Sequence, residues 1–293
     1  MGLLQTATAV RELVVVKQIE DLRFEVESAR KLDSSIAVVP TMGALHAGHL
    51  SLVQTACDEC DFVVVTVFVN PEQFGPNEDF DKYPRTQDAD LNACRELGVD
   101  LVFSPTEETV YPDGFYTFVE VKGLSDVLEG ECRPGHFRGV TTVVMKLLNL
   151  VQPDVAYFGR KDYQQQLLIR KMCRDLNVPV EISICPTVRE PDGLALSSRN
   201  RYLDPSQRQS ALSLSQCLRL AKDRLFAGET DVSAVRAEMQ NILESTPDVR
   251  VDYATVAHPE TLEELTEPLS SMIALVAARV RESRLIDNLP IRL

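Results

Sequence analysis

Short apolar runs alternate with helix-like segments over the first two thirds of the chain, and this alternation restricts the fold more than any other feature. The apolar runs are residues 36–39, 62–69, 101–104, 155–158 and 180–184. Segments with helical spacing precede or separate them, at residues 19–32, 48–60, 87–97, 140–151 and 164–176. Strands that alternate with helices predict an α/β domain built on a doubly wound, Rossmann-like parallel sheet.

The pattern changes near residue 185. Asp204 and Asp231 are predicted to cap two helices, and residues 249–257 and 272–280 have the composition of strands. We therefore predict a Rossmann-like domain at residues 1–185 and a smaller α+β domain at residues 186–293. Residues 114–121 also alternate in polarity and predict a strand in an insertion.

Charge and composition exclude several classes of protein. The formal net charge of −14 opposes binding of nucleic acid over a broad surface. No apolar run reaches transmembrane length and the amino terminus has no signal-peptide pattern, so we expect no membrane partner. Residues 1–6 match the loose N-myristoylation pattern, which is short enough to arise by chance.

The chain has seven cysteines, an odd number scattered through apolar segments. This usage indicates reduced thiols and a cytoplasmic protein. Cys57 and Cys60 form a C-x-x-C pair that invites a thiol or metal-binding interpretation. With Val53 they fall at the i, i+4 and i+7 positions of a helix, which favours a place on its buried side.

Two histidines follow the first apolar run. His46 and His49 are three residues apart, about one helical turn, so both rings can face one ligand. Gly43 and Gly48 let a ligand approach the backbone, and a helix that begins near Gly48 offers free N–H groups to an anion. Ligands bind at the carboxyl edge of a parallel sheet, and these N–H groups favour an anion, so a phosphate is the expected ligand. The alternatives are a capped helix start with solvated imidazoles, or a zinc pair, which lacks a third ligand at metal-like spacing.

Two further polar stretches are expected at the same edge, residues 159–162 and 193–201. They contain Lys161, Ser197, Ser198 and Arg199, whose charges and hydroxyls suit a nucleotide triphosphate. An ordinary polar turn explains residues 197–199 as well. The chain has neither a P-loop nor a G-x-G-x-x-G motif, so a nucleotide site depends on the H-x-G-H turn.

The H-x-G-H sequence at residues 46–49 resembles the first signature of the class I synthetase and nucleotidylyltransferase superfamily, and residues 196–199 occupy the place of its second. Six ordered blocks resemble the pantothenate synthetase (pantoate:beta-alanine ligase) family, at residues 40–46, 69–74, 83–86, 133–137, 161–165 and 197–200. Residues 284–288 resemble its carboxyl end. The resemblance implies ATP-dependent ligation of (R)-pantoate and β-alanine through a pantoyl adenylate, with Mg²⁺, in a homodimer.

The resemblance also implies site residues. The implied catalytic residues are His46, His49, Lys161 and Arg199, all acting on phosphate. Gln73 and Gln165 are the implied pantoate ligands, Gln73 also serving β-alanine, and Asn70, Arg133 and His136 are weaker candidates. Asp90 is an implied metal ligand, although an acidic first helical turn explains it equally. The implied ATP-binding residues are Met42, Gly43, Ala44, Leu45, His46, Ala47, Gly48, His49, Gly159, Arg160, Lys161, Asp162, Val188, Leu196, Ser197, Ser198 and Arg199.

Two other functions are open. A nucleotidylyltransferase of the same superfamily would act on a phosphorylated alcohol and shares the H-x-G-H turn, but it does not explain Gln73 and Gln165 in their blocks. A thiol or metal-binding module built on Cys57 and Cys60 is the alternative that is not an enzyme.

Overall fold

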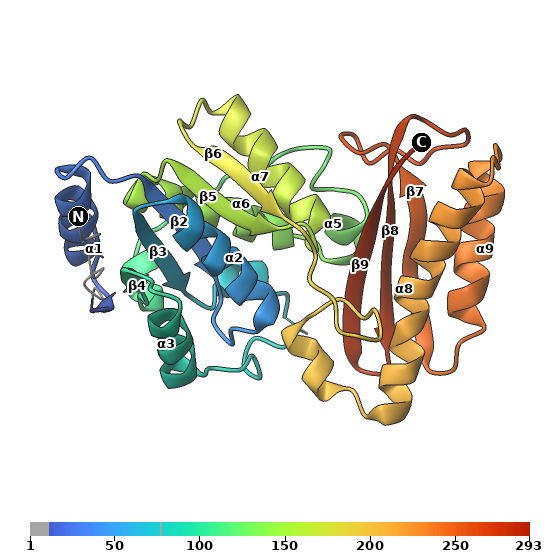
Figure 1. Cartoon of the computed structure of the whole chain (residues 1–293), viewed down its shortest axis with the longest axis horizontal. Coiled ribbons are helices and arrows are strands. Elements are labelled where there is room, and N and C mark those ends of the chain that lie inside the picture. The colour runs from blue at the N-terminus through green and yellow to red at the C-terminus, as the bar shows by residue number, and fades with distance from the viewer. Residues whose placement is uncertain (1–11, 77) are drawn as a thin grey trace, which may run out of the picture.

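The computed structural model describes residues 12–76 and 78–293, so the pattern at residues 1–6 lies outside the described residues. Two sheets lie side by side (Figure 1). The elements of the first part are β1 (Val14–Val16), α1 (Ile19–Arg30), β2 (Ile36–Thr41), α2 (Ala47–Glu59), β3 (Phe62–Val67), η1 (Pro71–Gln73), α3 (Gln87–Glu96), β4 (Leu101–Phe103), α4 (Glu107–Val110), α5 (Glu129–Cys132), α6 (His136–Val151), β5 (Val155–Gly159), α7 (Tyr163–Asp175) and β6 (Glu181–Cys185). Those of the second part are η2 (Ser198–Tyr202), α8 (Pro205–Phe226), α9 (Val232–Glu244), β7 (Val249–Ala257), β8 (Ser271–Val280) and β9 (Ser283–Arg292).

The first sheet has six parallel strands in the order β1-β4-β3-β2-β5-β6. From β2 the chain builds outwards to β3 and β4, then returns to the other side of β2 to form β5 and β6. The order therefore reverses between β2 and β5, which opens a crevice at the carboxyl ends of these two strands. The prediction of a doubly wound parallel sheet is confirmed.

Alternate residues of β2 face opposite layers of helices. Ile36 and Val38 belong to the apolar cluster formed with α1, α6 and α7, whereas Ala37 and Val39 belong to the cluster formed with α2 and α3. All four side chains are fully buried. Because both faces are covered, the strand is a continuous apolar run rather than an alternating one.

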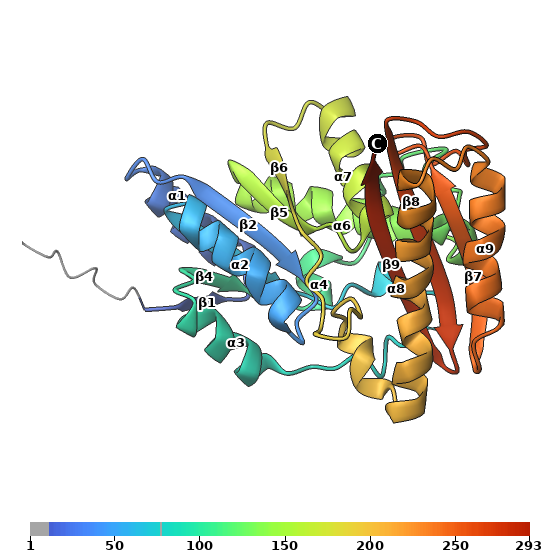
Figure 2. The same ribbon diagram turned by 45° about the vertical axis from the view of Figure 1, so that its right-hand side comes forward.

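The second sheet is antiparallel, in the order β7-β8-β9. Helices α8 and α9 cover one face of it (Figures 1 and 2). Its other face meets α7, through contacts such as Leu167 with Leu275 in one apolar cluster. Asp204 and Asp231 cap α8 and α9 as predicted. The division of the domains between residues 185 and 186 stays a prediction.

Three features differ from the sequence predictions, and the first is β1 (Val14–Val16), a strand that was not predicted. Residues 114–121 form no strand, because the backbone of Val119 bonds instead to side chains of α6, those of Thr141 and Thr142. Strand β9 was not predicted, since the polar side chains of Arg284, Asp287 and Asn288 interrupt its apolar pattern.

None of the seven cysteines forms a disulfide. All seven are free, and Cys57 and Cys60 pack against the cluster that contains Val53, as the helical spacing predicted. No group of three or more His, Cys, Asp or Glu side chains suited to a metal occurs among residues 12–76 and 78–293. Over the same residues, no helix is long and apolar enough to cross a bilayer.

A buried ion-pair cluster joins the two parts of the chain. The guanidinium of Arg284 in β9 donates to both carboxylate oxygens of Glu129, at 2.6 and 2.7 Å, and to Asp252 at 2.7 Å. The side chains of Arg284 and Glu129 are 13% and 8% exposed. Burial alone raises the pKa of Glu129, but hydrogen bonds and charge from Arg284 lower it overall.

Glu129→Gln is expected to lower the free energy of unfolding by about 3 kcal/mol, because it removes one partner of a buried pair. Since the pKa of Glu129 is lowered in the folded chain, its contribution is present above the unfolded-state pKa and is lost as the pH falls through the folded value. Urea unfolding at pH 7 measures the difference. The matched control is Asp248→Asn, which breaks the pair with Arg281, whose side chain is 63% exposed, and should cost less than about 1 kcal/mol. Equal losses in the two variants would contradict the role of burial.

Candidate active site

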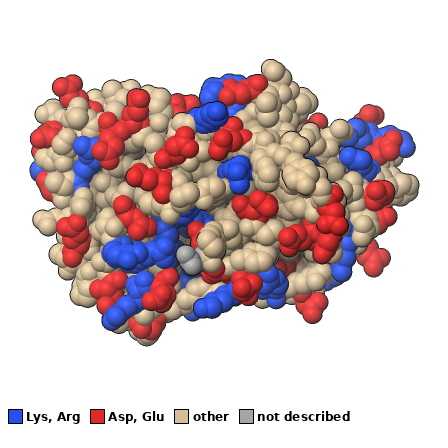
Figure 3. Space-filling model, turned by 180° about the vertical axis from the view of Figure 1, so that it is seen from behind, with Lys and Arg blue, Asp and Glu red and all other residues tan. Residues whose placement is uncertain are grey.

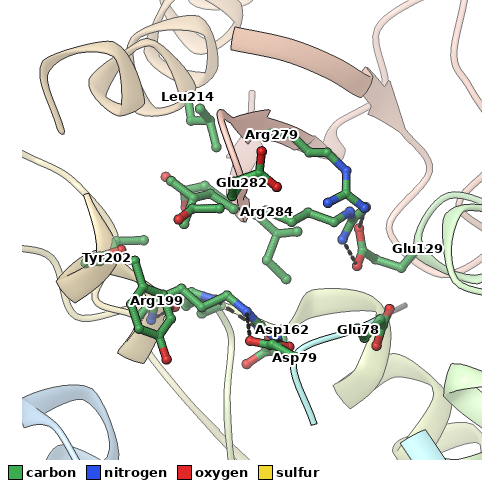
Figure 4. Close-up of a pocket in the computed structure, with 18 of the residues that line it drawn as sticks. Glu78, Asp79, Glu129, Asp162, Arg199, Tyr202, Leu214, Arg279, Glu282 and Arg284 are labelled. Carbon is green, nitrogen blue, oxygen red and sulfur yellow. Dashed lines mark hydrogen bonds and ion pairs between the residues drawn. The ribbon is translucent and has the colours of Figure 1, made fainter. Parts of the chain in front are cut away.

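A cavity of about 230 Å³ lies over the crevice between β2 and β5. Of the predicted site residues, its lining includes Met42, His46, Gly48, His49, Gln73, Gly159, Lys161, Asp162, Gln165, Val188, Leu196, Ser197, Ser198 and Arg199. The remaining predicted residues do not line it: Gly43, Ala44, Leu45, Ala47, Asp90 and Arg160. A second cavity of about 510 Å³ adjoins it between the two sheets and shares Lys161, Asp162, Ser197 and Arg199 (Figure 4).

The two histidines of the turn cap the helix that follows. Nδ1 of His46 accepts a hydrogen bond from the backbone N–H of Gly48 at 3.1 Å, and Nδ1 of His49 accepts one from the backbone N–H of His46 at 3.4 Å. The ring centroids are 4.1 Å apart. Since Nδ1 is an acceptor in both rings, each neutral ring has its proton on Nε2. Both histidines are therefore hydrogen-bond donors through Nε2.

Burial keeps these rings uncharged. It lowers the pKa of His49 to about 3, with help from neighbouring His46 and Lys161. Burial also lowers the pKa of His46, and the charge of Lys161 acts in the same direction. At neutral pH the pair can donate hydrogen bonds to an anion without itself adding positive charge.

The turn before α2 has a narrow backbone requirement. Gly43 has φ of +80°, and a Cβ at Gly48 would come within 2.9 Å of the His46 ring. Asp90 of α3, 3% exposed, accepts from the backbone N–H groups of Ala44 and Leu45 at 2.9 and 2.8 Å. Both oxygens of this carboxylate thus support the turn. A role for Asp90 as a metal ligand stays a prediction. In the structure its carboxylate holds the backbone of the turn.

The turn after β3 positions Gln73. The amide of Asn70, which is buried, donates to Oε1 of Gln73 at 3.1 Å and to the carbonyl of Gly139 at 3.2 Å. A Cβ at Gly139 would overlap the carbonyl oxygen of Glu72, so only glycine lets α6 approach this turn. The ring of His136 contacts the Gln73 carbonyl oxygen at 2.8 Å through Nδ1. Asn70 and His136, weaker candidates from the sequence, thus contact Gln73.

The loop after β5 brings a cation and a carboxylate to the cavity. Nζ of Lys161 lies 3.7 Å from Oδ1 of Asp162. Gln165, on the first turn of α7, faces the same cavity, and its amide has no hydrogen-bond partner among the described residues. The Gln165 amide is therefore available to a ligand.

Arg199 comes from the loop after β6 and contacts a residue that the sequence did not single out. Its guanidinium donates to both oxygens of Asp79, at 3.1 and 2.8 Å, and Figure 4 shows the pair at the edge of the larger cavity. Ser197 caps η2 by accepting from the backbone N–H of Arg199. The cluster of acidic residues Glu78, Asp79 and Asp81 was the available signal for a partner to a nearby cation.

The cavity concentrates cations in an acidic protein. Acidic side chains are spread across the face of the molecule seen in Figure 3, interspersed with Lys and Arg. The cavity itself is lined by three cationic side chains, Lys161, Arg199 and Arg133, by the carboxylate of Asp162, and by neutral histidines and amides. Such a lining can stabilise phosphate and carboxylate groups despite the net charge of −14.

Known proteins resemble this chain over nearly its whole length. Residues 14–290 match the family model described as pantoate-beta-alanine ligase. A pantothenate synthetase of Moorella thermoacetica is 51% identical over 288 residues, which are 98% of this chain and 98% of the relative. One of Chloroflexus aurantiacus is 53% identical over 265 residues, 90% of this chain and 94% of the relative.

Solved structures agree with these relatives. The pantothenate synthetase of Thermus thermophilus is 47% identical with a TM-score of 0.89, covering 94% of this chain and 98% of that one. The pantoate-beta-alanine ligase of Francisella tularensis, solved in complex with beta-gamma ATP and beta-alanine, is 34% identical with a TM-score of 0.77. That similarity covers 95% of this chain and 97% of the other.

His49 should be a neutral Nε2–H tautomer at pH 6, which long-range ¹H–¹⁵N NMR spectra can show directly. The unfolded chain binds a proton on His49 below about pH 6.5, whereas the folded chain does so only near pH 3. The free energy of unfolding should therefore decrease as the pH is lowered from about 6.5 to about 3, by up to about 1.4 kcal/mol per pH unit from this residue. His49→Gln should remove that share of the pH dependence. Titration of the His49 ring between pH 6 and 7 would show that the ring is not held neutral.

Proposed function

This chain belongs to the pantoate-beta-alanine ligase family, and on that premise we propose that it uses ATP to join (R)-pantoate and β-alanine into (R)-pantothenate. The observation that supports this most strongly is the single cavity lined by both phosphate-binding and amide side chains. His46, His49, Lys161, Ser197, Ser198 and Arg199 suit a triphosphate, and Gln73 with Gln165 suit a hydroxy acid.

In the proposed first step, an oxygen of the pantoate carboxylate attacks the α-phosphorus of ATP. The P–O bond to the β-phosphate breaks, so that pantoyl adenylate and diphosphate form. Charge grows on the departing diphosphate, and fixed donors around it stabilise that charge. Nε2–H of His46 and His49, the ammonium of Lys161 and the guanidinium of Arg199 are assigned to this task. The first turn of α2 has no acidic residue to oppose an anion.

Pantoate is assigned to the amides of Gln73 and Gln165. An amide both donates and accepts, so it can bind a hydroxyl and a carboxylate without a net charge. Val140 and Val143 of α6 also line the cavity and suit the two methyl groups of pantoate. In the second step the amine nitrogen of β-alanine attacks the acyl carbon and the bond to AMP breaks. Gln73 is assigned to β-alanine as well as to pantoate.

The rest of the ATP site is assigned to backbone and to one carboxylate. Asp162 is assigned to the ribose hydroxyls and the backbone of Val188 to adenine, with Gly159 and Leu196 beside them. Magnesium would accompany the triphosphate, since Mg²⁺ is commonly held by substrate phosphates and water. The described residues supply no cluster of protein ligands for it, and no chemical step is assigned to it.

A nucleotidylyltransferase acting on a phosphorylated alcohol is the second candidate. The H-x-G-H turn and the cations favour it equally. The neutral amides of Gln73 and Gln165 in the same cavity oppose it, because Lys or Arg would bind a second phosphate better. A homodimer and a cytoplasmic location stay predictions.

The experiment that tests the proposal supplies ATP, Mg²⁺ and (R)-pantoate to the purified protein, with or without β-alanine, and identifies products by mass spectrometry. Pantothenate, AMP and diphosphate should appear together when both substrates are present. No pantothenate from folded protein, or transfer of a nucleotide to a phosphorylated alcohol, would favour the second candidate.

Lys161→Ala is expected to lower kcat for adenylation about 10²–10³-fold, because the transition state loses a fixed cation. His49→Ala should cost a similar factor, since its Nε2–H donor is lost. Pyrophosphate exchange measures this step alone. The matched control is Lys171→Ala on α7, an exposed lysine paired with Asp175, which should retain full activity. Near-normal exchange in both site variants would refute the phosphate roles.

Asp79→Asn is expected to lower the KM for ATP severalfold, because ATP then no longer competes with a carboxylate for Arg199. Asp81→Asn removes the same charge two residues away. Asp81 is exposed and has no ion pair among the described residues, so this control reports any general effect of charge. If both variants shift KM equally, the pair with Arg199 is not the cause.

A further inference from the structure

The residues Asp287 and Asn288 of β9, which we call the β9 clasp, contact both loops that bring cations to the cavity. Strand β9 belongs to the second sheet and runs beside the segment that follows β6 (Figure 1). The clasp lies outside the assigned set of substrate-binding residues. It makes two sets of contacts, which we call its arms: Asn288 contacts the loop after β5, and Asp287 contacts the loop after β6.

The first arm is the amide of Asn288. Its nitrogen donates to the backbone carbonyls of Arg160 and Lys161, at 2.9 and 2.8 Å. The side chain is 2% exposed, and its Oδ1 has no hydrogen-bond partner. The amide nitrogen thus donates to two consecutive backbone carbonyls, whereas the amide oxygen makes no hydrogen bond. A side chain of similar shape that lacked the NH₂ group would lose the entire contact.

The second arm is the carboxylate of Asp287. It accepts from the guanidinium of Arg189 at 2.6 and 2.9 Å, and from the backbone N–H of Asn288 at 2.7 Å. Arg189 also donates to the carbonyl of Gly193 at 3.1 Å, which closes the loop from residue 189 to 195. That loop continues directly into Ser197 and Arg199.

Because the two arms start from adjacent residues of a buried strand, they fix the distance between the loops. Backbone restraint matters here, since the side chains of Lys161 and Arg199 are long and leave from those loops. We propose that the β9 clasp is a positioning device that sets Lys161 and the Ser197–Arg199 segment on the phosphates of ATP. This inference deepens the proposed function and rests on it.

The test compares Asn288→Leu and Asn288→Asp with the wild type. Leucine keeps the volume but removes the donors, and aspartate keeps the shape but turns an oxygen toward two carbonyls. We expect kcat/KM for ATP to fall roughly 10²-fold, with the larger loss in Asn288→Asp, and the KM for β-alanine to stay unchanged. Hydrogen exchange should accelerate at residues 159–163 in the absence of any substrate.

The matched control is Thr255→Val, which removes a buried hydroxyl from β7 of the same sheet; this hydroxyl bonds to Glu264 and touches neither loop. It should lower stability without changing kcat/KM for ATP or the exchange of residues 159–163. Unchanged exchange and unchanged kcat/KM for ATP in both Asn288 variants, while the wild type makes pantothenate, would overturn the clasp alone. A wild type that makes no pantothenate would overturn the proposed function, and the exchange result would still decide the clasp.

Discussion

Strand β2 is buried on both faces and between two parallel neighbours, and the rest of the site depends on that placement. The strand order reverses beside it, so its carboxyl end opens into the crevice instead of being covered by the next connection. The turn that follows must then satisfy its own backbone N–H groups. Asp90 and the two histidine rings accept hydrogen bonds from these N–H groups, which leaves Nε2–H of each ring without a partner among the described residues. The burial of β2 in the sheet thus determines where the Nε2–H donors of His46 and His49 lie.

The electrostatics of the cavity come from a few cations held in place by the second sheet. Neutral histidines add donors without charge, so the attraction for phosphate is concentrated in Lys161 and Arg199. Arg199 is already paired with Asp79, and a phosphate must compete with that carboxylate. The loops that carry both cations are fastened to β9, and β9 is fastened to the first part of the chain by Arg284. In the proposed function, substrate binding and the union of the two sheets therefore depend on the same strand.

Apolar periodicity was enough to predict the parallel sheet, because β2 and β3 are covered on both faces and their composition records it. Many polar residues that line the cavity were predicted, the two histidines from the H-x-G-H turn and Gln73 from the resemblance to a known family. Contacts between distant segments could not be predicted from local sequence patterns. Asp79 and Asn288 act on residues more than a hundred positions away, and nothing in their local sequence specifies those partners. The strand predicted at residues 114–121 is absent for a related reason, since the backbone of Val119 bonds to the side chains of Thr141 and Thr142 instead of to a neighbouring strand.

In the proposed function, the carboxylate of pantoate is activated by attachment to AMP. Pantoate labelled with ¹⁸O in its carboxylate tests this most directly when the products of one turnover with ATP and β-alanine are weighed by mass spectrometry. An adenylate intermediate predicts that one ¹⁸O atom passes into AMP, because the acyl C–O bond breaks when the amine attacks. Label that appears in inorganic phosphate with ADP as the nucleotide product, or unlabelled AMP beside labelled pantothenate, would contradict the account.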